Sequence, residues 1–325
     1  MFRFVEILFH QQTSYTSSLS GYVPTRRCYA MNFQKHSKTY QELVQTLKER
    51  NLLVADESKA IDFLGRVHYY RLSAYFPPFQ SAKDCFDTNT TFEDIVRLYE
   101  FDVELRKFVF AYIEKVEIAL RAKIVQVHTQ QYGALGYAED IKSLDITNMK
   151  DMSVYCEVAH SIQKEKIRTK ELFVQHFRDE YQMQDLPLWA CVELLSFGNL
   201  SKLFSILFPQ DKKAILQSFG SSIHPKPFQN WLMCLNTIRN ICAHHARLWN
   251  REFGTGFKRP KKTNFLHANV NNKKIFFALS VLAEILKDSS IKAGLQTLLA
   301  QYPAIPTKSM GIPQFWESLS PWSNL

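Results

Sequence analysis

Two residues that could perform acid–base chemistry on a phosphate, Arg239 and His244, lie five positions apart in the segment RNICAHHARLWNR, residues 239–251. A histidine titrates near neutral pH and can accept the proton of an RNA 2′-OH or donate one to the leaving 5′-oxygen. An arginine stays charged and can hold the phosphate while charge builds on its oxygens. This pair therefore predicts metal-independent RNA cleavage, although two common residues at one spacing also arise as a structural arginine and a surface histidine.

The helix expected to carry this pair does not bring the two side chains together by itself. An apolar periodicity predicts a helix over residues 228–249,. At about 100° per residue, Arg239 and His244 are separated by roughly 140° around such a helix. Three arrangements remain open: the arginine curls around the helix, the helix is distorted near His244, or a second subunit completes the site.

The positive charge of the chain is concentrated around the same motif. The 325 residues have a formal net charge of +9, and residues 239–274 alone hold nine basic residues and one acidic residue. Such a segment favours contact with the phosphates of a nucleic acid, and a solvated basic loop is the alternative. The residues expected to bind RNA in this window are Arg251, Lys258, Arg259, Lys261 and Lys262.

The periodicity along the chain predicts an all-α fold. Helices are expected over residues 40–51, 58–65, 91–132 (as one helix or as two with a bend near Phe101–Asp102), 154–180, 185–208 (as two helices around Gly198), 228–249, 274–287 and 291–301,. A polar loop is expected over residues 80–91, and residues 302–322, with four prolines, are expected to run extended along the surface. The predicted organisation is a disordered tail or mis-assigned start over residues 1–36, an N-terminal helical unit over 37–90, and a core over 91–325 that contains a basic loop at 254–274.

Cofactors, metals and membranes are not expected from the sequence. The six cysteines form no C-x-x-C, which favours a reducing, cytoplasmic setting,. The spacing of Cys234, Cys242, His244 and His245 fits no common zinc pattern,. No phosphate-binding glycine loop is present,, and the longest apolar stretch, residues 275–286, is too short to cross a membrane and indicates a buried helix,.

Several sequence blocks resemble the HEPN superfamily and, within it, abortive-infection proteins of the AbiD/AbiF type. These blocks are HYYRLSAYFPPF at 68–79, the segment 91–124, LSFGNLSKLF at 195–204, the Arg–His segment 239–251 and the closing segment 302–322. The resemblance implies a HEPN-like helical bundle with an N-terminal helical extension. It also implies a homodimer with a cleft between subunits and RNA as the substrate. A toxin of this kind is expected to be silenced by an antitoxin, either a protein or a small RNA, or by a conformational lock.

The resemblance also assigns roles to individual residues. It implies that Arg239 binds the phosphate and stabilises the transition state, that His244 is the acid–base, and that the motif is supported by Asn240, His245, Arg247 and Asn250. Glu117 and Arg121 are either an exposed ion-pair row or a support for the site from the neighbouring helix,. Arg71 is a candidate RNA contact within an aromatic block, Tyr69 to Phe79, that is more typical of a core. The sequence thus predicts a phage-defence endoribonuclease, and a non-catalytic RNA-binding or sensor module is the alternative.

Overall fold

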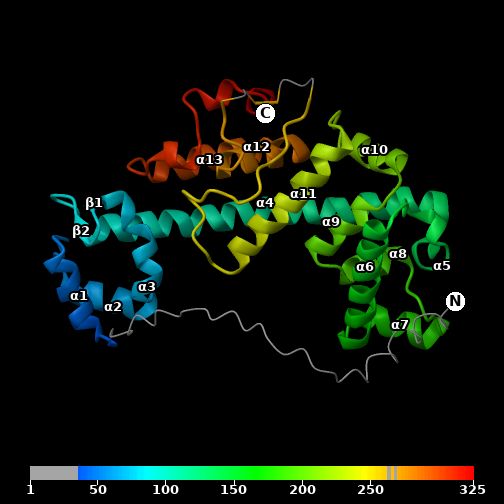
Figure 1. Cartoon of the computed structure of the whole chain (residues 1–325), viewed down its shortest axis with the longest axis horizontal. Coiled ribbons are helices and arrows are strands. Elements are labelled where there is room, and N and C mark those ends of the chain that lie inside the picture. Colours follow the sequence, from blue (N-terminus) through cyan, green and yellow to red (C-terminus); the bar gives the residue numbers. More distant parts are fainter. Residues whose placement is uncertain (1–35, 262–264, 267–268) are drawn as a thin grey trace, which may run out of the picture.

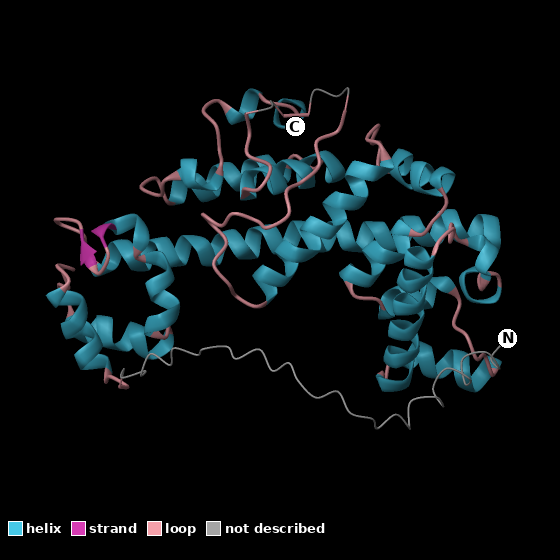
Figure 2. Ribbon diagram, viewed as in Figure 1, coloured by secondary structure: helices cyan, strands magenta, loops and turns pink. Residues whose placement is uncertain are grey.

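The fold is built almost entirely from helices. The computed structural model describes residues 36–261, 265–266 and 269–325. Within these residues the chain forms thirteen α-helices, short 3-10 turns and one two-stranded hairpin (Figure 2). The predicted all-α class is therefore confirmed. The expected tail, residues 1–36, lies outside the described residues except for its last member.

A single long helix, α4 (Phe92–Tyr132), supports the rest of the molecule (Figure 1). Its 41 residues correspond to a length of about 60 Å,. Thr91 is the N-cap and forms a reciprocal capping box with Asp94, which fixes where the helix starts,. The helix continues through Phe101–Asp102 without a break, so the one-helix alternative of the sequence prediction is correct.

The N-terminal unit lies at one end of α4 (Figure 1). Its elements are α1 (Tyr40–Glu49), α2 (Glu57–Arg66), α3 (Tyr69–Leu72) and the hairpin β1 (Gln80–Ala82) with β2 (Cys85–Phe86). The hairpin lies where a polar loop was expected. Its buried Phe86 explains the difference, because the ring packs edge-on against Phe76 with centroids 5.2 Å apart and its N–H bonds to the Arg50 carbonyl.

Six helices follow at the other end of α4: α5 (Gly136–Glu139), α6 (Met149–Arg168), α7 (Leu172–Tyr181), α8 (Leu188–Leu194), α9 (Phe197–Ser205) and α10 (Pro209–Ser218). The break between α8 and α9 falls at Leu195–Ser196 and not at Gly198 as expected. Ser196 caps α9 by accepting a bond from the Asn199 N–H, whereas Gly198 lies inside α9. A Cβ at Gly198 would lie 3.1 Å from the Asn236 side chain, so its small size serves helix packing.

Three helices complete the core: α11 (Pro225–Ala243), α12 (Ile275–Leu286) and α13 (Ser290–Gln301), each in contact with α4. Ten of the twelve residues of α12 are buried, which confirms the expected buried helix. No helix in the described part of the chain combines the length and the apolar character needed to cross a lipid bilayer.

The C-terminal segment, residues 302–322, differs from the extended course along the surface that its prolines predicted. It forms three 3-10 turns, Thr307–Met310, Trp316–Ser318 and Trp322–Asn324. Trp322 is fully buried, stacks on Phe276 at 5.8 Å and donates from its indole N–H to the Ser280 hydroxyl at 2.8 Å. Burial of this large aromatic surface on α12 holds the segment down.

Candidate active site at the end of helix α11

Helix α11 ends inside the Arg–His motif. The predicted helix ran to Trp249, but the last helical residue is Ala243 and His244 is the C-cap. The Ala246 N–H bonds to the Ile241 carbonyl at 2.9 Å, and the His245 N–H bonds to the Cys242 carbonyl at 3.0 Å. This pair of bonds is a Schellman motif, which satisfies carbonyls at a helix end. The helix therefore does end near His244, as the second of the three arrangements supposes, but this change does not bring His244 into the cleft that Arg239 lines.

His245 occupies the position at which most such helix ends have glycine. Its φ angle is 55°, in the left-handed region, which is unfavourable for a residue with a Cβ. The Arg71 guanidinium, considered as an RNA contact, donates to the His245 carbonyl and so holds this turn. Arg247 makes the reverse connection and donates to the Ala74 carbonyl at 2.9 Å. The N-terminal unit is thus bonded to the motif from both sides.

A buried carboxylate on α4 holds the segment that follows. Asp102 is fully buried, is ion-paired with Arg106, and accepts from the Tyr75 hydroxyl at 2.6 Å. It also accepts from the backbone N–H groups of Leu248 and Trp249, the latter at 2.7 Å. Burial raises the pKa of Asp102, while Arg106 and these donors oppose that effect,. The carboxylate therefore closes the turn and stops α11 from continuing.

Arg239 faces a polar cleft on the side of α4. Its guanidinium carbon lies 5.7 Å from the centre of the Phe110 ring, a cation–π distance. Within the described residues the guanidinium makes no hydrogen bond or ion pair, and its Nε is buried without an acceptor. The other two arginines of the cleft are paired, Arg121 with Glu117 and two carbonyls and Arg168 with Glu165. Arg239 differs from them because its donors have no partner among the described residues.

Glu117 and Arg121 line the same cleft as Arg239, so the interpretation that places them beside the site agrees with the geometry. The cleft has a volume of about 540 Å³. Its polar lining residues come from four helices and are Glu117, Arg121, His160, Ser161, Lys164, Glu165, Arg168, Ser196, Asn199 and Arg239. Arg121 donates to Glu117 at 2.7 Å and to the carbonyls of Val192 and Leu195 at 2.9 and 2.7 Å. This pair is partly buried and braces the end of α8.

The structure does not bring His244 into that cleft. Asn240 and His244 are exposed, and together with Met233 and Thr237 they form the exposed face of α11, beside Arg239 on the helix surface. His245 lines a separate hollow of about 290 Å³ with Phe110, Lys107 and Cys242. Phe110 thus contacts Arg239 and also lines the hollow of His245, while the cleft lined by Arg239 contains neither His244 nor His245.

The basic loop covers the opposite flank of α11. The Asn230 side chain accepts from the Lys258 N–H at 2.5 Å, and the Trp231 indole donates to the Lys258 carbonyl at 2.8 Å. Lys258 and Lys261 have exposed side chains, whereas Arg251 is half-buried. Arg259 turns inward, packs on the Phe277 ring at 5.1 Å and bonds to the Val270 carbonyl. Lys262 lies outside the described residues.

Asn250, expected to support the motif, is held in place through a hydrogen bond to its backbone carbonyl. Its carbonyl accepts from Lys274 Nζ at 3.0 Å. Its side-chain oxygen is buried and has no hydrogen-bond partner among the described residues. Asn250 therefore marks the point where the motif segment is tied to the start of α12.

A comparison with known families matches most of this region. Residues 62–250 match the family described as Abi-like protein. The chain belongs to the Abi-like protein family. Searches of curated proteins and of solved structures gave no match. The family name refers to abortive infection, a form of defence against phage, and the matched range ends just after the Arg–His segment.

The two cysteines and two histidines considered as metal ligands do not surround a common site in this Abi-like protein. Cys234 and Cys242 are buried while His244 and His245 are exposed. Burial raises the pKa of Cys234 to about 11 and that of Cys242 to about 12, so both thiols are neutral near pH 7,. Across the described ranges, no three metal-binding side chains are grouped closely enough to hold an ion.

Sequence reasoning missed two features of this Abi-like site. The first is α6, whose His160, Lys164 and Arg168 line the cleft of Arg239. Their spacing of four residues was visible as one face of a helix, but nothing in the sequence placed that helix next to α11. The second is Asp102, whose position within an apolar helix face was the available signal, since a buried carboxylate needs partners.

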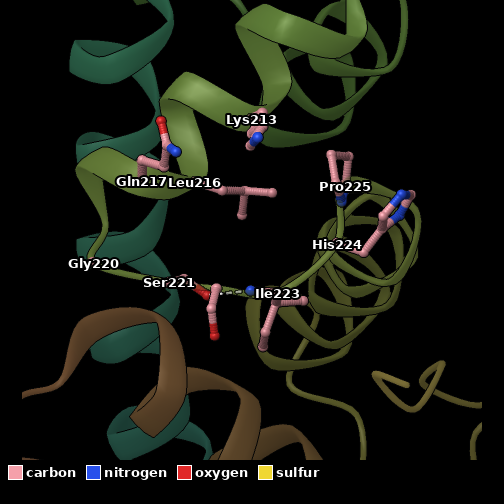
Figure 3. A pocket seen from close by; sticks show the side chains of 9 residues that line it. Lys213, Leu216, Gln217, Gly220, Ser221, Ile223, His224 and Pro225 are labelled. Carbon is pink, nitrogen blue, oxygen red and sulfur yellow. Dashed lines mark hydrogen bonds between the residues drawn. The ribbon is translucent and has the colours of Figure 1, made fainter. Parts of the chain in front are cut away.

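A second pocket, of about 500 Å³, lies between α10 and the start of α11 (Figure 3). Lys213, Gln217, Ser221 and His224 are among the residues lining it. It contains none of the predicted site residues, and His224 in it is used to cap α11 by accepting from the Lys226 N–H. This Abi-like chain therefore concentrates its predicted chemistry at the other end of α11.

Proposed function

We propose that the protein is a metal-independent endoribonuclease of the HEPN type that acts in abortive infection against phage. The proposal is carried by the surroundings of Arg239, which lines a polar cleft, packs on the Phe110 ring and has no hydrogen-bond acceptor among the described residues. A guanidinium held in this way is ready to bind a phosphodiester.

The reaction follows from the two groups of the motif. Arg239 holds the non-bridging oxygens of the phosphate. His244 takes the proton from the 2′-OH as its oxygen attacks phosphorus, the bond from phosphorus to the 5′-oxygen breaks, and the leaving oxygen takes a proton from water, after which the His244 imidazolium returns its proton to the solvent. The products are a 2′,3′-cyclic phosphate and a free 5′-OH. Asn240 lies on the exposed face between the two residues and is proposed to contact the ribose or phosphate.

The separation of Arg239 from His244 supports a homodimeric site. His244 lies on the exposed face of α11 and not in the cleft that Arg239 lines. If two copies associate through this face, the histidine of one copy reaches the arginine of the other. The proposed active state is therefore a homodimer in which each copy contributes to both sites.

The same separation favours a second candidate of a different class, an RNA-binding or sensor module that does not cut. The exposed Lys258 and Lys261 would provide salt-dependent affinity without any chemistry,. An antitoxin, protein or small RNA, belongs to the first proposal, because a free ribonuclease would harm its own cell.

The test is a cleavage assay with end-labelled single-stranded RNA in EDTA, using wild type, Arg239→Ala and His244→Ala. A matched control is His224→Asn, which removes an exposed histidine at the other end of α11 and keeps a capping side chain,. The enzyme proposal expects cyclic-phosphate ends from wild type and the control, and a loss of at least about 100-fold in both motif variants.

Other outcomes of the assay exclude one candidate or the other. RNA binding without cleavage by all four proteins would reject the enzyme and support the sensor. Cleavage that survives His244→Ala would reject the role of His244. Sedimentation of wild type with and without RNA then decides whether the active species is a dimer.

A further inference from the structure

One wall of the cleft that Arg239 lines is formed by one face of α6. His160, Lys164 and Arg168 follow one another at intervals of four residues and all line the cleft,. Within the described residues, His160 and Lys164 form no hydrogen bond or ion pair, and both are exposed. Arg168 is paired with Glu165 at 2.7 Å. The α6 face therefore presents one uncommitted charge, that of Lys164, and one imidazole.

The remaining charges of the cleft are already paired. Arg121 is bound to Glu117 and to two carbonyls. After this pair and the Arg168–Glu165 pair are set aside, the cations left in the cleft are Lys164 from α6 and Arg239 from α11. Ser196, the N-cap of α9, and Asn199 lie at the same cleft and add polar groups. Two uncommitted cations from different helices in one cleft favour a polyanion as the ligand.

The size and lining of the cleft indicate which part of a nucleic acid it takes. A volume of about 540 Å³ is within the range of small-molecule sites and accommodates a nucleotide unit,. Base-binding sites for single strands use aromatic platforms, and among the residues lining this cleft His160 has the only ring. The cleft is therefore suited to phosphate and ribose and not to a stacked base.

We propose that this cleft is a subsite for the RNA backbone, in which Lys164 and His160 of α6 bind a phosphate next to the one held by Arg239. The inference rests on the proposed function, because it takes RNA as the ligand. It adds to the proposed site one wall, the face of α6, whose residues lie outside the Arg–His motif. It also predicts that this subsite binds RNA without preference for sequence, since only backbone groups are contacted.

The test measures binding separately from cleavage. A fluorescein-labelled 2′-O-methyl RNA oligomer of mixed sequence cannot be cut, because its nucleophile is blocked, and its affinity is measured by anisotropy at several salt concentrations. The variant is His160→Gln/Lys164→Gln, and the matched control is Lys150→Gln, which removes an exposed lysine at the start of the same helix, outside the cleft. Circular dichroism verifies that each variant keeps its helix content.

The double variant is expected to bind about 10-fold more weakly and to lower the slope of log K against log salt by about 0.7, the value for one phosphate of a single strand. Lys150→Gln is expected to match wild type. Equal affinity and slope in the double variant and the control would overturn the subsite, and so would a wild type that does not bind the oligomer.

Failure of the subsite is distinguishable from failure of the proposed enzyme. If wild type binds the blocked oligomer but never cuts unmodified RNA, the ribonuclease is rejected while the subsite is still decided by the double variant. If wild type cuts RNA and the double variant binds as the control does, only the subsite is rejected.

Discussion

At the scale of residues, the motif depends on one backbone position that its sequence did not reveal. His245 is in the left-handed region, with φ of 55°, and its carbonyl is bonded to Arg71. The adjacent residues His244 and His245 suggested that both histidines take part in the chemistry. The backbone of His245 instead forms the turn that ends α11. A conformation that disfavours a Cβ, found next to candidate catalytic groups, is typical of functional sites in which surrounding contacts hold the strained residue.

Replacing His245 by glycine and by alanine separates its backbone role from its side-chain role. Both variants remove the imidazole, but only glycine fits the left-handed position freely. We expect His245→Gly to be about 1 kcal/mol more stable than His245→Ala in urea denaturation. Equal stability of the two variants would show that the turn relaxes when the histidine is removed.

At the scale of elements, the sequence predicted where helices form better than it predicted where they end and how they pack against one another. Periodicity identified α4, α11 and α12, because each has a long apolar face,. It extended α11 six residues too far, to Trp249, because Leu248 and Trp249 continue the apolar pattern. Their N–H groups instead bond to Asp102, 146 residues earlier in the chain. A partner so distant in sequence leaves no local signal.

The same limit explains the outcome for the candidate site. The Arg–His segment was found from spacing, and Glu117 and Arg121 were found as candidates from their own helix. The α6 wall of the cleft and the separation of His244 from Arg239 depend on how helices pack around α4. Packing between elements far apart in sequence is a property of the tertiary structure.

Breaking the bond network between α4 and the motif is expected to destabilise the protein strongly. Asp102→Asn removes the charge that compensates the buried Arg106, and breaking a buried pair costs about 3–5 kcal/mol. The control is Glu104→Gln on the same helix, whose exposed pair with Lys107 contributes at most about 1 kcal/mol,. Chemical denaturation measures both. An Asp102→Asn protein within about 1 kcal/mol of wild type would contradict the importance of this network.

At the scale of the whole molecule, the charge distribution divides the chain into a near-neutral scaffold and one basic segment. Residues 239–274 contain nine basic and one acidic residue of a chain with net charge +9. The described part of this segment lies along α11, on the flank away from Arg239, with the exposed face of α11 between them. An RNA strand that crosses this face would therefore contact the basic loop on one side and the cleft on the other.

Neutralising two exposed lysines of this segment tests that arrangement. Lys258→Gln/Lys261→Gln is expected to lower the salt dependence of RNA binding by about 1.4 in slope, if each lysine contacts one phosphate. The control, Lys59→Gln/Lys83→Gln, removes the same charge from exposed positions of the N-terminal unit. Anisotropy titrations over a range of salt give both slopes. An equal decrease in the two variants would mean that net charge alone attracts the RNA.

The bonds that tie the motif segment to the N-terminal unit and to α4 have a practical consequence for preparing shorter forms of the protein. A fragment that starts at Thr91, the N-cap of α4, would remove Arg71, the donor to the His245 carbonyl, and Tyr75, a donor to Asp102. A fragment limited to residues 62–250 would cut α2 (Glu57–Arg66) in half and remove Trp322 and the α12 surface that it covers. A fragment from Thr39, the N-cap of α1, to Leu325 keeps all of these contacts.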